Sequence, residues 1–200
     1  AGLSYKIVLT VLGICIPTGL IGITVILRMA QSSGDYRFCR IMAWLYPQDP
    51  RWSDIAAQHQ NSIMAIGSGQ LWGKGLNNSA ATSMKNANYI IEPQTDFIFA
   101  VAGEELGFIG TMVIVLLLLF IVIECILIAR KAKDLAGRLI CCGMAALIGF
   151  QSIFNIFVAT GLMPNTGIPL PFVSYGLTSL LSLYLGMGFV LNVGLQPKKY

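Results

Sequence analysis

The sequence predicts an all-α polytopic membrane protein, with four transmembrane helices and a large extracellular loop that contains short amphipathic helices. The first observation is composition, because 56% of the 200 residues are hydrophobic and only 11% are charged, which is more apolar surface than a soluble domain of this size can bury. The second is that several uncharged windows reach the roughly 20 residues that cross a bilayer as a helix. The third is a net charge of only +4, without a basic run, which argues against a nucleic-acid partner.

The four spans are predicted at residues 7–27, 106–129, 139–162 and 172–195, within a single membrane domain that covers residues 1–200. We expect the chain to start just before a transmembrane helix, inside a longer protein.

The long polar segment 29–91 does not span the membrane, and it is predicted to contain two short helices. Residues 36–45 form an amphipathic pattern that ends before Pro47, because proline interrupts a helix. Apolar residues in 53–66 recur at helical spacing up to Gly67, a helix stop signal. The following stretch 67–75 is rich in glycine but lacks the spacing of a phosphate-binding loop.

Orientation follows from the short basic flanks, which favour the cytoplasmic side. Lys6, the connection 130–138 and the pair Lys198 and Lys199 share one side if there are four spans. Both termini are therefore predicted to be cytoplasmic, and the loops 29–91 and 163–171 extracellular. This places Asp96 at the outer membrane face.

Four of the nine acidic residues of the chain lie within the stretch 92–105, and they are Glu92, Asp96, Glu104 and Glu105. Thr95 is a plausible N-cap that puts Asp96 in the first turn of a helix, where the dipole stabilises a carboxylate. Asp96 is thus either a helix-start residue or a catalytic or ligand-binding acid. Glu104 and Glu105 lie deeper, where an ionised group is costly unless it is functional or paired with a loop arginine.

Two lysines, Lys74 and Lys85, are predicted on the same outer side as Asp96 and would suit phosphate groups. The single histidine, His59, has no catalytic or metal-binding pattern around it, so we expect a hydrogen-bonded helix residue. The five cysteines show no metal-type spacing. An outer-face acid with nearby cations fits either a lipid-linked phosphate substrate or an ion-coupled transporter.

Several motifs resemble the SEDS family (shape, elongation, division and sporulation; RodA/FtsW/SpoVE-like) of bacterial cell-wall proteins. The resemblance covers nearly the whole chain and rests on SIMAIGSG at 62–69 with GKG at 73–75, EPQTDFIFA at 92–100 with EELG at 104–107, Asn155, and GIPLPFVSYG at 167–176. Departures are Ile90-Ile91 before Glu92, Gln70 in place of a glycine, and Leu177-Thr178 after the last motif. The chain looks like the last four spans and the large extracellular loop of such a protein.

The resemblance implies a peptidoglycan glycosyltransferase of the bacterial cytoplasmic membrane that polymerises lipid II, with a class B penicillin-binding protein as its transpeptidase partner. Asp96 matches the essential aspartate of the family and Glu92 its neighbouring glutamate. Asp96 is then the general base or the anchor of a divalent metal ion, Mg²⁺ or Mn²⁺. The candidate contacts for the departing pyrophosphate are Lys74, Lys85, Arg37 and Arg40.

Two other functions remain open. A lipid II flippase predicts a polar path lined by residues such as Gln151, Asn155 and Glu124, whereas Glu124 in a structural role would reach toward the cytoplasmic interface. A non-catalytic membrane scaffold for a penicillin-binding protein predicts that the acids are replaceable. The motifs do not separate elongation, division and sporulation members.

Overall fold

The computed structural model describes residues 36–76 and 95–196, and in these ranges all regular structure is helical. The side chains of Tyr36 and Arg37 are not described. The predicted span 7–27 lies outside the described residues, so the fourth transmembrane helix stays a prediction.

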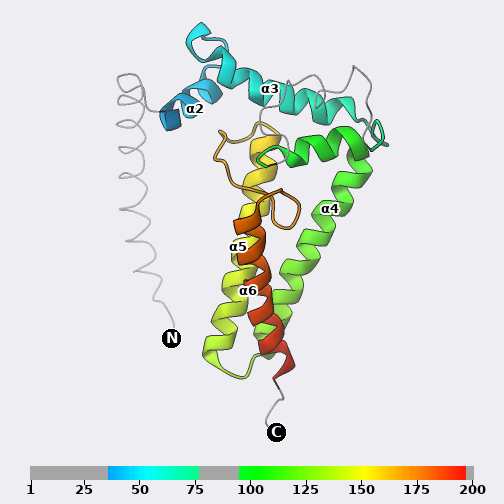
Figure 1. Ribbon diagram of the computed structural model, residues 1–200, viewed down its shortest axis with the longest axis vertical. Helices are drawn as coiled ribbons and strands as arrows, with labels where there is room; N and C mark the ends of the chain where they lie inside the picture. Colours follow the sequence, from blue (N-terminus) through cyan, green and yellow to red (C-terminus); the bar gives the residue numbers. More distant parts are fainter. Residues whose placement is uncertain (1–35, 77–94, 197–200) are drawn as a thin grey trace, which may run out of the picture.

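A surface layer of short helices precedes the long ones (Figure 1). Helix α2 covers Tyr36–Leu45, the 3-10 turn η1 covers Pro50–Trp52, and α3 covers Ser53–Ser68. The Asp49 carboxylate accepts a hydrogen bond from the Arg51 amide and fixes the start of η1. Both predicted amphipathic helices are therefore confirmed, with α3 ending one residue beyond Gly67.

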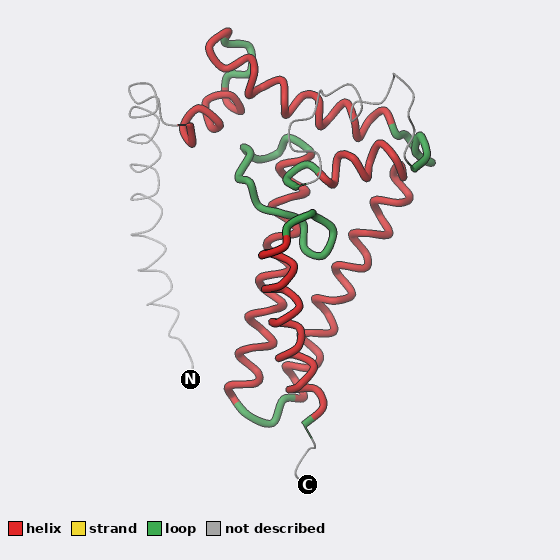
Figure 2. The backbone as a smooth tube through the Cα atoms, in the orientation of Figure 1, coloured by secondary structure: helices red, strands yellow, loops and turns green. Residues whose placement is uncertain are grey.

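Helix α4, Ile98–Lys131, is 34 residues long and bends at Gly107, whose φ of 69° and ψ of −169° interrupt the helix. This conformation is essentially restricted to glycine. The bend turns a first segment that lies beside α3 into the long apolar segment of the bundle (Figure 2). The predicted span 106–129 matches the segment beyond the bend.

Helices α5 (Leu135–Ala159) and α6 (Leu177–Leu195) complete the bundle. At the loop 160–176 that connects them, both are shorter than the predicted spans 139–162 and 172–195. Helix α5 stops at Ala159 because Gly161 adopts a positive φ of 78°. Residues 172–176 belong to the loop because Phe172 has a φ of 61°, which a helix does not allow.

The three long helices run alongside each other beneath the surface layer, and the loop 160–176 folds back under it (Figure 1). Buried Phe97 packs with Ala65, Ala100 and Val158, and so joins α3, α4 and α5. A second cluster around Cys125, Cys141 and Val190 joins α4, α5 and α6 at the other end.

In the described part of the chain, α4, α5 and α6 are each long and apolar enough to cross a membrane. Many of their large apolar side chains are exposed in the isolated chain, such as Leu117, Phe120 and Phe150. An exposed apolar belt of this extent is expected of helices that face lipid or other membrane helices. The protein is therefore a polytopic membrane protein.

Candidate active site

Asp96 lies in the turn that precedes α4, between Thr95 and the buried Phe97. The helix begins at Ile98 with Phe97 as its N-cap, so the prediction that Thr95 is the N-cap and that Asp96 lies in the first helical turn was wrong by two residues. The physical reason is that burial of the Phe97 ring, rather than a side-chain cap, fixes the helix start. Asp96 consequently lies just ahead of the helix, at the edge of the core.

The backbone on both sides of Asp96 is held by side chains from distant parts of the sequence. Asn155 Nδ2 on α5 donates to the Asp96 carbonyl oxygen at 2.9 Å and to the Ile168 carbonyl oxygen at 2.8 Å. Ser174 Oγ donates to the Thr95 carbonyl oxygen at 2.7 Å and accepts from the Leu170 amide at 2.7 Å. The Asp96 turn is therefore tied to both α5 and the loop 160–176.

The Asp96 carboxylate and the Arg40 guanidinium approach the same point of that loop. A β-carbon on Gly167 would lie 3.5 Å from Asp96 Oδ2 and 3.6 Å from Arg40 Nη1. Gly167 has a φ of 70°, a conformation that favours glycine. Arg40 Nη1 also donates to the Asn165 carbonyl oxygen at 3.3 Å. Two of the predicted site residues are thus brought together: Arg40 from α2, and Asp96 from the turn just before α4.

Lys74, a predicted pyrophosphate contact, forms an ion pair with Glu104. The distance from Lys74 Nζ to Glu104 Oε1 is 2.9 Å, and the Glu104 side chain is only 1% exposed. Of the two possibilities for Glu104, a functional role or pairing with a loop arginine, the structure shows pairing with a basic residue of the loop, although the partner is a lysine. A substrate role for Lys74 stays a prediction, and it would have to share the ammonium with Glu104.

The glycine-rich stretch 67–75 has a structural use here, because it wraps around the bend of α4. The Lys74 and Gly75 amides donate to the Glu104 and Glu105 carbonyl oxygens, and the Phe108 amide donates to the Gln70 carbonyl oxygen. A β-carbon on Gly69 or Gly73 would collide with the α4 backbone. Small residues are needed for this close approach.

His59 on α3 is buried and its ring lies edge-on to Phe97, with the ring centroids 6.1 Å apart. Burial lowers the pKa of its imidazole. Within the described ranges neither ring nitrogen has a hydrogen-bond partner, so the expectation of a hydrogen-bonded helix residue is not met. The ring instead contributes to the wall behind the Asp96 turn.

Three predicted residues cannot be placed. Glu92 and Lys85 lie outside the described residues, and only the backbone of Arg37, within α2, is described. The structure adds Asn155 and Ser174, whose roles as clamps on the Asp96 turn the sequence did not reveal. The sequence does mark both residues, since both are polar residues within or beside apolar segments and both belong to the motifs that resemble the SEDS family.

Few of the described side chains could serve as ligands of a divalent cation at this site. In residues 36–76 and 95–196 no group of three or more His, Cys, Asp or Glu side chains could hold a metal ion. Asp96 supplies one carboxylate, with the Arg40 guanidinium close by. Mg²⁺ is commonly held by one or two carboxylates together with substrate phosphates, so these residues suit only an ion that is shared with a phosphorylated substrate.

Comparison with known proteins shows which family the chain resembles. The model of the cell cycle protein family, which groups FtsW, RodA and SpoVE, matches residues 1–199. Stage V sporulation protein E of Bacillus subtilis is 43% identical over 176 residues, which cover 88% of this chain and 46% of that protein. A probable peptidoglycan glycosyltransferase FtsW of Geobacter sulfurreducens is 40% identical over 82% of this chain and 43% of its own length.

A solved structure is also similar, from work titled "Structural coordination of polymerization and crosslinking by a peptidoglycan synthase complex". It aligns with a TM-score of 0.62 and 26% identity, over 90% of this chain and 48% of the solved chain. The present chain therefore spans less than half the length of these relatives from Bacillus and Geobacter. With a family match over almost every residue, the chain belongs to the FtsW/RodA/SpoVE family, the SEDS family.

Proposed function

We propose that this chain carries the polymerising site of a peptidoglycan glycosyltransferase, which joins lipid II units into glycan strands at the outer face of the bacterial cytoplasmic membrane. The observation that carries the proposal is the approach of the Asp96 carboxylate and the Arg40 guanidinium to one point above Gly167. A carboxylate can accept the proton of the attacking hydroxyl, and a nearby cation can stabilise the departing pyrophosphate. A relative named as a probable peptidoglycan glycosyltransferase, 40% identical, supports the assignment.

In the proposed reaction, Asp96 takes the proton of the acceptor sugar hydroxyl. The acceptor oxygen forms a bond to the anomeric carbon of the donor, and the bond from that carbon to the pyrophosphate oxygen breaks. The electron pair leaves with undecaprenyl pyrophosphate. A positioned general base contributes about 10²–10⁴-fold to such a step.

Arg40 is the first candidate for stabilising the departing pyrophosphate, because a guanidinium can offer two parallel N–H donors to phosphate oxygens. The clamps from Asn155 and Ser174 hold the Asp96 turn in place before substrate arrives. A site that is already arranged needs little reorganisation during the reaction. Lys74, Lys85, Arg37 and Glu92 remain proposed supporting contacts.

A Mg²⁺ or Mn²⁺ ion is a proposed cofactor, which Asp96 would hold together with the substrate phosphates. Such an ion, when bound, would neutralise charge on the leaving pyrophosphate. Arg40 already supplies one positive charge at this position.

The proposed partners are lipid II, the surrounding bilayer and a class B penicillin-binding protein. The similarity to a chain from a peptidoglycan synthase complex supports a transpeptidase partner. We further propose that both termini are cytoplasmic and that the Asp96 end of the bundle is extracellular, as the basic flanks predict.

The deciding experiment is Asp96→Asn in the full-length protein, together with its transpeptidase partner, assayed by glycan-strand formation from lipid II. We expect polymerisation to fall at least about 100-fold. Asp54→Asn is the matched control, because Asp54 is an exposed acid in the first turn of α3. Polymerisation at the wild-type rate in Asp96→Asn would exclude the catalytic role.

The same variant separates the rival functions. Loss of polymerisation with retained binding of the partner would exclude a pure scaffold. A flippase is tested separately by lipid II translocation in vesicles. Of the three residues named for a polar path, Asn155 is used in backbone hydrogen bonds at the site and Glu124 lines a groove between α4 and α6. Gln151 Oε1 is buried without a hydrogen-bond partner among the described residues.

A further inference from the structure

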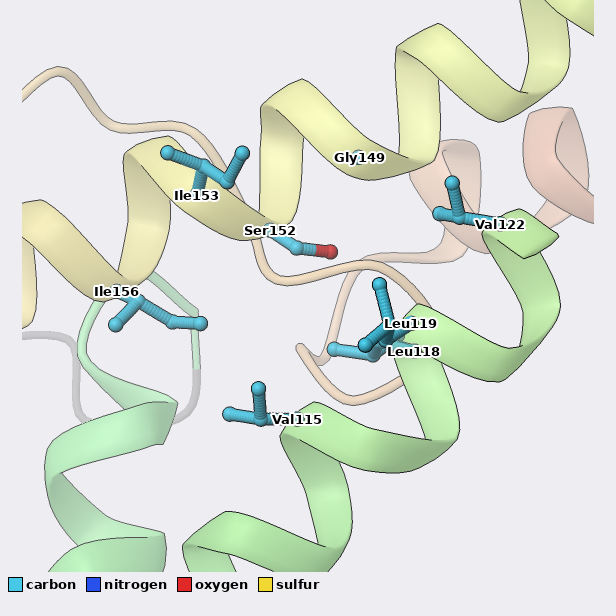
Figure 3. A pocket seen from close by; sticks show the side chains of 8 residues that line it. All are labelled: Val115, Leu118, Leu119, Val122, Gly149, Ser152, Ile153 and Ile156. Carbon is cyan, nitrogen blue, oxygen red and sulfur yellow. The ribbon is translucent and has the colours of Figure 1, made fainter.

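Two cavities lie one after the other between α4 and α5, from the middle of the bundle to the connection between the two helices, and together we call them the α4–α5 groove. Its upper part is a cavity of about 200 Å³ (Figure 3), and its lower part is a cavity of about 310 Å³. The lining residues of α4, among them Val115, Leu119, Val122 and Ile126, recur at spacings of three and four, so they share one face of the helix. The two cavities therefore follow one another along the same face of α4.

The upper part of this groove is apolar. Side chains of α4 and α5 point into it from both sides (Figure 3), and its one polar side chain is Ser152. Ser152 Oγ donates to the Ile148 carbonyl oxygen of its own helix at 2.7 Å. The one polar group that lines the cavity therefore already has a hydrogen-bond partner, and a hydrocarbon chain suits the remaining apolar lining.

The lower part ends in two arginines. Arg130, in the last turn of α4, and Arg138, in the first turns of α5, line the cavity beside Ile126, Ala129 and Cys142. Within the described ranges, neither guanidinium forms an ion pair. The acid nearest in sequence is Asp134, which is exposed and precedes α5. Two arginines at the mouth of a cavity favour an anion, and basic pockets between membrane helices are suited to lipid head groups.

The groove covers more than half of the depth of a bilayer core. Its lining residues on α4 run from Val115 to Arg130, a rise of about 22 Å against the roughly 30 Å of the hydrocarbon core. A helix is about 10–12 Å across, so it could lie over the upper cavity but could not enter it. A single hydrocarbon chain could enter.

We propose that this groove binds an anionic phospholipid, with its phosphate on Arg130 and Arg138 and one acyl chain in the slot between α4 and α5. The groove opens at the end of the bundle opposite to Asp96, so this lipid is neither donor nor acceptor of the proposed transfer. The proposal needs only that α4 and α5 lie in a membrane, and it stands if the glycosyltransferase assignment fails.

The test is native mass spectrometry of the full-length protein titrated with phosphatidylglycerol, phosphatidylcholine or inorganic phosphate. We expect phosphatidylglycerol to bind in preference to phosphatidylcholine, and Arg130→Gln with Arg138→Gln to weaken its binding about 30-fold, from roughly 1 kcal/mol for each of the two basic residues. The matched control is Lys131→Gln with Lys133→Gln, which removes the same charge from exposed residues that do not line this cavity.

A second variant tests the slot. Gly149→Leu should fill the upper cavity and weaken phosphatidylglycerol binding, while thermal unfolding in lipid-free detergent shows whether the fold is kept. Equal loss in the arginine and lysine variants would mean diffuse surface attraction and would overturn the proposal. So would binding of inorganic phosphate as tight as that of the lipid, or a photo-crosslinker at Ile126 that captures a protein helix instead of lipid.

Discussion

The two ends of the molecule are held together by different means. At the Asp96 end, backbone groups of the segment 70–75, the α4 region and the loop 160–176 are joined by hydrogen bonds between residues far apart in sequence. At the other end, α4, α5 and α6 meet through apolar contacts around Cys125 and Val190, with cavities between them. A site must fix the position of a charged group to within a fraction of an ångström, whereas a bundle in lipid needs only close packing.

The largest expected effect comes from the bend of α4. Gly107→Val should destabilise the fold by more than about 3 kcal/mol, because a β-branched residue cannot adopt this backbone conformation without strain and its β-carbon would lie 2.7 Å from the Leu71 carbonyl oxygen. The measurement is thermal unfolding of the purified protein in detergent. Gly143→Ala on α5 is the control, since a β-carbon there meets nothing within 4 Å. Equal effects of both variants would contradict the importance of the bend.

A smaller effect is expected from the clamp on Asp96. Asn155→Ala leaves the Asp96 and Ile168 carbonyl oxygens without their buried donor, which should cost about 1–3 kcal/mol. It should also reduce polymerisation by moving the Asp96 turn. Ser152→Ala, one turn earlier on α5, removes only a hydrogen bond within its own helix and should cost less than about 1 kcal/mol. Unfolding and polymerisation should be measured on both variants. If both lose the same stability and activity, precise positioning by side-chain hydrogen bonds is not confined to the Asp96 end.

The smallest effect concerns pH. The pKa of His59 is lowered by burial in the folded protein, so the fold favours the neutral ring. The resulting stability is present above the ordinary histidine pKa of about 6.5 and is lost as pH falls below it toward the lowered folded value. Unfolding temperatures at successive pH values should therefore fall on the acid side in the wild type and fall less in His59→Phe. An identical pH profile in both proteins would contradict a neutral buried His59.

Much of the fold follows from local sequence patterns. The two surface helices and three of the membrane helices were predicted to within a few residues, because apolar windows and helical spacing are properties of contiguous sequence. The errors lie at the helix ends, where single residues decide the boundary. Burial of Phe97 sets the start of α4, and the positive φ of Gly161 and of Phe172 sets the limits of the loop between α5 and α6. The candidate residue Asp96 was also found from sequence, through its motif and its place ahead of an apolar segment.

The sequence by itself therefore determined the membrane class, the helices and the acid that we propose as the base. Only the tertiary structure decided which groups meet that acid. Arg40, Asn155 and Ser174 are 56, 59 and 78 positions from Asp96 by their numbering, so local sequence patterns did not show that these three residues would meet at Asp96. The packing of α2 and α5 against the loop 160–176 brings them together, since burial of Phe97 and the close glycine contacts at the α4 bend leave the chain few other arrangements.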